Sequence, residues 1–541
     1  MKTSKIIAML LCFALTVGML AGCGGNSQSS TPAQAPASGT GDANGNVTSA
    51  KDTLVIRVAS DNGTIDYHNS TADNVTRLRS LICNSLLEAK RNEAGDIEFV
   101  CGEESLATGY ALDADGMGIT FDIREGVKFS NGYDMTPSDV VFSIKLYEGM
   151  SGFDFVDFAN VSAEGTSVYV PFTSPNAGVL YFVGLMIPVY SEQYYNELGG
   201  EASLAEFYST SAIGTGPYKL DEWVVGDYVA LSANESYFAG KPLIEHVRIR
   251  LISEPSVAMM ELETGGVDIV VDPAATDVKN MLDGSYDGEG ITYWQDKGTQ
   301  QYVLGYNCSG PLGSLELRKA LSYAIDMDAI NETVYGVSAS PAKSVMSSTS
   351  EGSVDLTGSY PYSYDPAKAV ECRNAAGYKE GELHLIYLVG GGDALRTAVG
   401  EMMARYLADV GIEMEIVNVD KSAWASMIKD VNGWDVHLRG ISSVGTTYLD
   451  YFTNMLPQTA HFDSDPDSAK LMETMRTISQ TMDDAKRLEM WKDVQEQYLT
   501  DYLYSLPLSQ VNDYTLVNEK LMNAEKVSLF RFNLTNAYFV D

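Results

Sequence analysis

The chain has 541 residues and a formal net charge of −37, and 45% of its residues are hydrophobic. This length predicts two or three lobes, and the hydrophobic content is sufficient for sizeable cores. The acidic balance excludes nucleic acid as a partner, because phosphate binding needs Lys and Arg.

The first 22 residues have the layout of a secretion signal. A basic start precedes an apolar run over residues 6–20, which is too short to cross a bilayer. The tetrapeptide Leu20-Ala21-Gly22-Cys23 resembles the bacterial lipobox, whose Cys becomes the lipidated first residue of the mature protein. We therefore expect a signal peptide over 1–22 and a lipid anchor on Cys23, with the protein on the outer face of the cell membrane. The alternative is an ordinary signal peptide that contains a Cys, and the Gram type of the host stays open.

The segment behind Cys23 predicts a flexible tether that reaches to residue 51. It contains no aromatic side chain and is rich in Gly, Ser, Ala, Pro and Asn. Leu54–Ala59 then predicts a strand, and a helix is expected over 74–88.

The middle of the chain alternates between strand-like and helix-like patterns. Ile119–Ile123 alternates by two, as in a half-buried strand. Thr136, Pro137 and Asp139 are typical of the cap and first turn of a helix. Apolar residues at helical spacing predict further helices over 317–325, 399–410 and 471–482. Residues 412–416 alternate by two and predict a strand. Mixed elements of this kind favour α/β or α+β lobes.

Catalytic and metal-binding motifs are missing from the sequence. None of the five His lies in a metal-binding spacing, and neither a nucleophile elbow nor a phosphate loop occurs. The Gly390-Gly391-Gly392 run lacks the third Gly of a dinucleotide loop and predicts an ordinary turn between strand and helix. We expect no catalytic residue, no metal and no cofactor.

Four cysteines remain in the mature chain besides Cys23: Cys83, Cys101, Cys308 and Cys372. Export permits disulfides, and four cysteines allow three full pairings. Cys83–Cys101 is the candidate bridge with the shortest separation, and the pairing stays open.

Residues 119–143 carry a pattern that resembles the family 5 extracellular solute-binding proteins, the oligopeptide and dipeptide receptors of ABC importers. The matching residues are Arg124, Glu125, Gly126, Val127, Lys128, Phe129, Gly132, Thr136, Asp139, Val140, Phe142 and Ser143. Further family motifs follow in order, at 214–218, 234–242, 262–268, 307–326, 364–378 and 411–435. Single motifs are weak, but their order is specific, and the resemblance covers nearly all of 52–541.

The resemblance implies an α/β, two-lobed, periplasmic-binding-protein-like fold with an extra domain in one lobe and a ligand cleft between the lobes. Carried over to this chain, lobe I comprises 52–88, 210–300 and 506–541, the extra domain 89–209, and lobe II 301–505. The implied protein is a monomer that does no covalent chemistry. It captures oligopeptides or a peptide-like solute, closes around it and delivers it to ABC permease subunits.

One departure from the family pattern concerns the acid that holds a peptide's α-amine. That Asp falls on Val444, or on Gly445 if the alignment slips by one residue. A buried ammonium without a carboxylate is costly. Either Asp450 or Asp73 substitutes, or the ligand is a non-peptide such as a sugar, a metal chelate or an opine-like compound.

The resemblance places the ligand between segments of both lobes. The expected ligand-binding residues are Asn69, Ser70, Thr71, Asp73, Trp424, Arg439, Val444, Gly445 and Thr446. Trp424 is equally explained by core packing, and Thr71 and Asp73 by capping of a helix. A rival of another class is a surface hydrolase that uses two of the many carboxylates, although no position in the sequence supports it.

Overall fold

The computed structural model describes residues 48–60, 64, 66, 68, 73–92, 97–203, 206–208, 213–286, 288–391, 393–442, 448–463, 465–528 and 531–541. The expected signal peptide, Cys23 and most of the expected tether lie outside these residues. No helix in the described ranges is long and apolar enough to cross a membrane.

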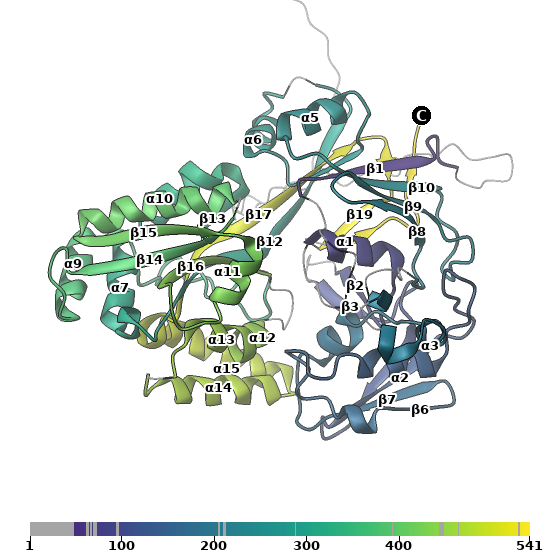
Figure 1. Cartoon of the computed structure of the whole chain (residues 1–541), viewed down its shortest axis with the longest axis horizontal. Coiled ribbons are helices and arrows are strands. Elements are labelled where there is room, and N and C mark those ends of the chain that lie inside the picture. The colour runs from purple at the N-terminus through teal and green to yellow at the C-terminus, as the bar shows by residue number, and fades with distance from the viewer. Residues whose placement is uncertain are drawn as a thin grey trace, which may run out of the picture. The chain divides into compact units, whose positions relative to one another are not determined.

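Eleven strands form one sheet in the order β15-β14-β16-β12-β17-β11-β1-β10-β9-β8, with β13 paired to β17 (Figure 1). Their bounds are β1 Thr53–Val58, β8 Tyr218–Val224, β9 Tyr228–Ala233, β10 His246–Leu251, β11 Ile269–Val271, β12 Ile291–Tyr306, β13 Ala339–Pro341, β14 Leu383–Gly390, β15 Ile412–Val419, β16 Val436–Ser442 and β17 Ser505–Asn518.

Two hydrophobic cores lie along this sheet and define two lobes. The core of the first lobe draws its buried side chains from 54–271 and 517–539. The core of the second lobe draws its buried side chains from 303–508. The long antiparallel strands β12 and β17 run side by side from one lobe to the other (Figure 1).

The pairing of β12 with β17 is irregular between the lobes. Lys297 pairs with Asn512, but the next paired residue of β12 is Gln301, which lies opposite Gln510. An irregularity of this kind interrupts the ladder and bends the strand. A second register shift follows between Tyr302 and Val303, so the ladder is interrupted twice along this stretch.

The first lobe carries a second, four-stranded sheet in the order β4-β5-β7-β6. Its strands are β4 Ala107–Leu112, β5 Gly118–Ile123, β6 Ser162–Glu164 and β7 Ser167–Pro171. Three further strand pairs are β2 Glu88–Arg91 with β3 Ile97–Val100, β18 Leu521–Met522 with β21 Tyr538–Phe539, and β19 Glu525–Ser528 with β20 Arg531–Asn533. The alternation predicted for residues 119–123 is confirmed, because Ile119, Phe121 and Ile123 are all buried.

The helices cover both sheets. They are α1 Asp73–Ile82, α2 Pro137–Lys145, α3 Glu192–Glu197, α5 Pro255–Glu263, α6 Ala275–Asp283, α7 Leu315–Ala324, α8 Met327–Ile330, α9 Pro366–Ala375, α10 Ala394–Asp409, α11 Lys421–Met427, α12 Tyr448–Asp450, α13 Leu456–Ala460, α14 Ser468–Gln480 and α15 Asp484–Gln497. The predicted start of α2 is confirmed, since the Asp139 carboxylate accepts hydrogen bonds of 2.8 Å from the backbone N–H and the hydroxyl of Thr136. Helix α10 ends before Gly411, whose φ is +70°.

The helix expected over 74–88 ends earlier, at Ile82. The N–H of Gly216 donates to the carbonyl oxygen of Ile82 at 2.9 Å, so this oxygen cannot continue the helical ladder. A Cβ on Gly216 would lie 2.4 Å from the carbonyl carbon of Ile82, so only glycine allows this approach. Residues 88–91 instead form β2. The Gly-Thr-Gly-Pro-Tyr motif therefore has a structural task, which is to end α1.

The candidate bridge Cys83–Cys101 is not formed. The four described cysteines form no disulfide with one another. Burial, which is the largest influence, raises the pKa of the Cys308 thiol to about 11, so this thiol is protonated near neutral pH.

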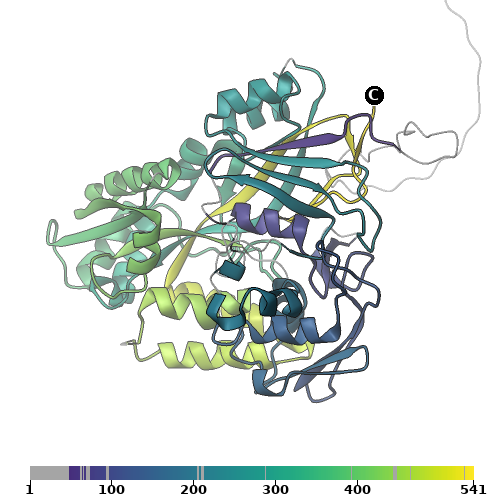
Figure 2. The same ribbon diagram turned by 45° about the vertical axis from the view of Figure 1, so that its right-hand side comes forward.

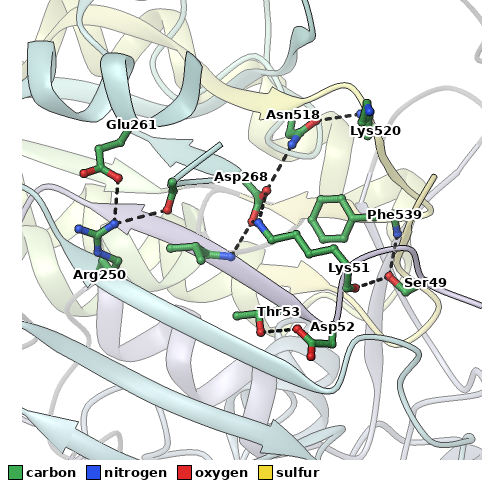
Figure 3. A network of polar contacts seen from close by, with 12 residues as sticks. Ser49, Lys51, Asp52, Thr53, Arg250, Glu261, Asp268, Asn518, Lys520 and Phe539 are labelled. Carbon is green, nitrogen blue, oxygen red and sulfur yellow. Dashed lines mark hydrogen bonds and ion pairs between the residues drawn. The ribbon is translucent and has the colours of Figure 1, made fainter. Parts of the chain in front are cut away.

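A buried carboxylate fixes the start of the folded chain (Figure 3). Asp268 is fully buried and accepts hydrogen bonds from Lys51 Nζ at 2.7 and 2.9 Å, from the Val55 N–H at 2.9 Å and from Asn518 Nδ2 at 3.3 Å. These donors come from the N-terminal segment, from β1 and from β17. Asp268 thereby joins the beginning and the end of the first lobe.

Candidate functional site

The candidate site of the second lobe lies at the carboxyl ends of its parallel strands. Strand β14 pairs in parallel with β15 on one side and with β16 on the other. Helix α10 follows β14 and α11 follows β15, so the chain order reverses between β14 and β16. Open α/β sheets bind ligands outside the carboxyl ends of the strands, at the point where the strand order reverses. We call the ends of β14 and β16, with the first turns of α10 and α11, the carboxyl edge.

Trp424 and Arg396 lie against each other at the carboxyl edge. Trp424 belongs to the first turns of α11, which Asp420 caps by accepting a 2.8 Å hydrogen bond from the Ala423 N–H. The Arg396 guanidinium lies 5.7 Å from the centre of the Trp424 ring and 3.2 Å from the carboxylate of Asp393. The ion pair with Asp393 holds Arg396 in the first turn of α10.

Arg439, near the end of β16, is the third polar side chain of the carboxyl edge. Its Nη2 lies 3.4 Å from the sulfur of Met455, which is a weak acceptor. Burial, which is the largest influence, lowers the pKa of Arg439, and the nearby charge of Arg396 lowers it further. Within the described ranges, Arg396 Nε, Trp424 Nε1 and Arg439 Nε are buried and have no hydrogen-bond partner, and the same holds for both ring nitrogens of the neighbouring His437. Buried donors are normally satisfied, so these nitrogens are exceptions.

His437 lies beneath this edge and is uncharged. Its ring is fully buried, 5.8 Å from the Trp424 ring and 5.1 Å from the Trp434 ring. Burial first, and then the charges of Arg439 and Arg396, hold the pKa of His437 well below its ordinary value. The sequence analysis missed both His437 and Arg396. A site role for Arg396 could have been inferred from the sequence, because Arg396 lies in the first helical turn after the Gly-rich loop that follows a predicted strand.

Asp450, a predicted substitute for the missing amine-binding acid, lies at the end of α12. Its carboxylate accepts a 2.9 Å hydrogen bond from Asn454 and lies 3.2 Å from the position of a Cβ on Gly152 of the first lobe. Burial, the largest influence, raises the pKa of Asp450; Asn454 and Arg439 oppose this rise, and Asp154 adds to it. The acid thus lies where the two lobes meet.

The corresponding edge of the first lobe lies at the carboxyl ends of β1 and β11, which are parallel. Arg57 is buried there and donates to the carbonyl oxygens of Ile252 and Val271, both at 2.7 Å. His68 stacks on Tyr208 with a centroid distance of 4.1 Å. The predicted residues Asn69, Ser70 and Thr71 lie outside the described residues. Asp73 is the first residue of α1, and its side chain also lies outside them.

Of the other predicted site residues, some are described by the structure and some are not. The structure brings Trp424 and Arg439 to the same edge, whereas Val444, Gly445 and Thr446 lie outside the described residues. In the described part of the chain, no group of three or more His, Cys, Asp or Glu side chains could hold a metal ion.

The two lobes contact each other away from β12 and β17. The N–H of Ala177 donates to the carbonyl oxygen of Ser479, at the end of α14, at 2.8 Å. Near this bond, a Cβ on Gly116 would lie 2.9 Å from Cγ of Met482. Figure 2 shows α14 and α15, in yellow-green, beside the blue segment of the first lobe. The lobes therefore touch at a second place besides the two connecting strands.

Comparisons with known proteins agree with this architecture. Residues 103–463 match the model of the bacterial extracellular solute-binding proteins, family 5 Middle. The chain is 25% identical to heme-binding protein A of Haemophilus influenzae over 56% of its own length and 57% of that protein. It is 25% identical to the dipeptide-binding protein of Escherichia coli over 64% of its own length and 68% of that protein.

The solved structure of the oligopeptide-binding protein AppA from Bacillus subtilis in complex with a nonapeptide is similar over 91% of this chain and 100% of AppA. The TM-score is 0.77 and the identity 19%. This likeness confirms the predicted two-lobed α/β fold.

Proposed function

Because the chain belongs to the bacterial extracellular solute-binding proteins of family 5, we propose that it captures a peptide or peptide-like solute at the carboxyl edge and delivers it to an ABC permease. The protein does no covalent chemistry in this account. It acts outside the cytoplasm as a monomer, held to the membrane by lipid on Cys23.

The observation that carries the proposal is the set of unpartnered donors at the carboxyl edge. Arg396 Nε, Trp424 Nε1 and Arg439 Nε are buried and have no acceptor among the described residues. An unsatisfied buried donor costs about 1–3 kcal/mol, and a solute with oxygen acceptors removes this cost. A peptide carries such acceptors at every residue.

Capture is coupled to closure of the lobes. A solute can drive closure only if it binds the closed form more tightly than the open form. The register shift between Lys297 and Gln301 is where the two connecting strands bend most easily, so it is the proposed hinge. The bond between Ala177 and Ser479 then forms as the lobes meet.

A non-peptide solute is the second candidate, and one observation favours it. By the resemblance to peptide-binding members of the family, the acid that pairs with the α-amine falls on Val444 or Gly445 in this sequence. One relative of this chain is named heme-binding protein A, so a protein similar to it is named for a ligand that is not a peptide. In this case the same donors hold the oxygens of a sugar, a metal chelate or an opine-like compound.

Identification of the natural solute tests the proposal. Protein purified without denaturation is unfolded in acid, and the released small molecules are identified by mass spectrometry. A peptide or another solute at about one molecule per chain supports capture. Cleavage of added peptides by the purified protein would instead support the rival hydrolase.

A further inference from the structure

Two arginines of the first lobe meet at one turn of its backbone. Arg79, in the last turn of α1, donates from Nη1 to the carbonyl oxygen of Met186 at 3.2 Å. Arg531, the first residue of β20, donates from Nη2 to the carbonyl oxygen of Leu185 at 3.3 Å. Because these oxygens belong to consecutive residues, the two guanidinium groups lie close together.

Neither of these arginines has an acidic partner among the described residues. The ion pairs of the described ranges include Arg77 with Asp272 and Arg91 with Asp296, but none with Arg79 or Arg531. Only 7% of the surface of Arg79 is exposed. Burial, the largest influence, and the like charge of Arg79 lower the pKa of Arg531 to about 9. Two like charges, one buried and one half-buried, without a counter-charge are costly, and a negative group beside them relieves the cost.

The helical segment beside the arginine pair lies near the second lobe, because Phe182 of this segment and Asp450 of the second lobe lie 2.6 and 3.2 Å from the same Cβ position on Gly152. Tyr181 belongs to the same helical segment as Leu185 and Met186, which spans Leu180–Met186. Burial raises the pKa of the Tyr181 phenol, the charge of Asp450 adds to this rise, and the charges of Arg531 and Arg79 oppose it. Tyr181 is thus within electrostatic range of the arginine pair and of an acid of the second lobe.

A cavity of about 180 Å³ opens beside Arg531, between α1, β2 and the β19–β20 hairpin. Its other cations already have partners: Lys90 lies 2.7 Å from Glu88, and Arg91 lies 2.5 Å from Asp296. Glu104 also lines the cavity, and burial raises the pKa of its carboxyl. Glu525 lies at the exposed rim. Among the cations that line the cavity in the described ranges, Arg531 is the one that forms no ion pair.

We propose that Arg79 and Arg531 form an anion subsite that receives a carboxylate of the bound solute. The planar guanidinium of Arg531 matches a carboxylate in two-point geometry, and Arg79 supplies a second positive charge. This inference rests on the proposed function. It assigns to the first lobe a second point of attachment, separate from the donors of the carboxyl edge. The carboxylate is either the C-terminus of a peptide or the acid group of a non-peptide solute.

The test compares retention of three defined pools by the purified full-length protein: random tripeptides with free C-termini, the same tripeptides amidated, and a set of small dicarboxylic acids. Arg531→Met removes the proposed contact. Arg248→Met is the matched control, because Arg248 is an exposed arginine of the same lobe that stacks on Tyr228 at 3.7 Å. Arg531→Lys retains the positive charge but cannot bind a carboxylate at two points. It is the test variant if Arg531→Met does not fold. Retained molecules are identified and their affinities measured.

We expect the wild type to retain a carboxylate pool about ten- to a hundredfold better than the amides, and Arg531→Met to lose this preference. Retention of peptides over dicarboxylic acids assigns the carboxylate to a C-terminus, and the reverse assigns it to a non-peptide solute. Equal retention of acids and amides by the wild type, or an unchanged preference in Arg531→Met, overturns the subsite and leaves solute capture intact. Retention of none of the pools counts against the proposed function and the subsite together.

Discussion

The N–H of Ala177 donates a 2.8 Å hydrogen bond to the carbonyl oxygen of Ser479, so the first lobe is bonded directly to the end of α14 in the second lobe. A backbone bond of this kind fixes position without selecting a ligand. Near it, Gly116 has a φ of +71° and faces Met482. This contact can be weakened without touching the carboxyl edge, which makes closure testable separately from recognition.

Gly116→Ala should weaken closure, because the added Cβ lies 2.9 Å from Cγ of Met482. Gly165→Ala is the matched control: its φ is +59°, it lies in a hairpin turn of the same sheet, and its Cβ would have no neighbour within 4 Å. Both variants carry backbone strain of about 1 kcal/mol. Only Gly116→Ala should lower solute affinity, by several-fold, in titration calorimetry. Equal affinities for the two variants would show that this contact does not take part in closure.

Asp268→Asn should destabilise the first lobe by about 2–4 kcal/mol, because the bonds from Lys51 and Val55 to a buried carboxylate are weakened. Asp52→Asn is the control, since Asp52 is exposed and its carboxylate accepts a hydrogen bond from the hydroxyl of the neighbouring Thr53. The free energy of unfolding is measured by urea titration. If Asp268→Asn lowers the free energy of unfolding no more than the control does, Asp268 does not stabilise the start of the folded chain.

Acid should destabilise the protein through His68. Burial, as the largest influence, lowers the pKa of His68 to about 4, whereas an unfolded histidine titrates near 6.5. The unfolded state therefore takes up the proton first, so this stabilisation is complete above about pH 6.5 and is lost as the pH falls toward 4. We expect the stability difference between wild type and His68→Gln to shrink by about 2–3 kcal/mol from pH 7 to pH 4.5.

His246→Gln is the control for this pH dependence, because His246 is exposed. The stability difference between wild type and His246→Gln is measured over the same pH range as the reference. A constant difference for His68→Gln would mean that His68 takes up its proton over the same pH range in the folded and the unfolded state.

Cys23→Ser should release the protein into the medium of a Gram-positive host and abolish labelling with radioactive palmitate. Cys12→Ser, inside the expected signal peptide, is the control and should leave both unchanged. Stable attachment needs more than one acyl chain, so loss of the acceptor cysteine removes it. Continued labelling of Cys23→Ser would rule out the lipobox.

The sequence predicted local structure well where one residue decides the backbone. Thr136 and Asp139 define the start of α2, and the alternation at 119–123 places three side chains in the core. It failed at Ile82, because the helix end depends on Gly216, which is distant in the chain. The grouping of Arg396 with Arg439, and of Arg79 with Arg531, depends likewise on how separate elements pack. No local pattern carries that information.

The central claim is that this chain captures a small solute by closing its two lobes. Small-angle X-ray scattering of the purified protein, measured with its co-purified solute and after the solute has been removed by unfolding and refolding, tests this claim most directly. The account predicts a smaller radius of gyration with the solute bound, and a return to that value when the solute is added back. An identical scattering profile in both states at saturating solute would contradict it.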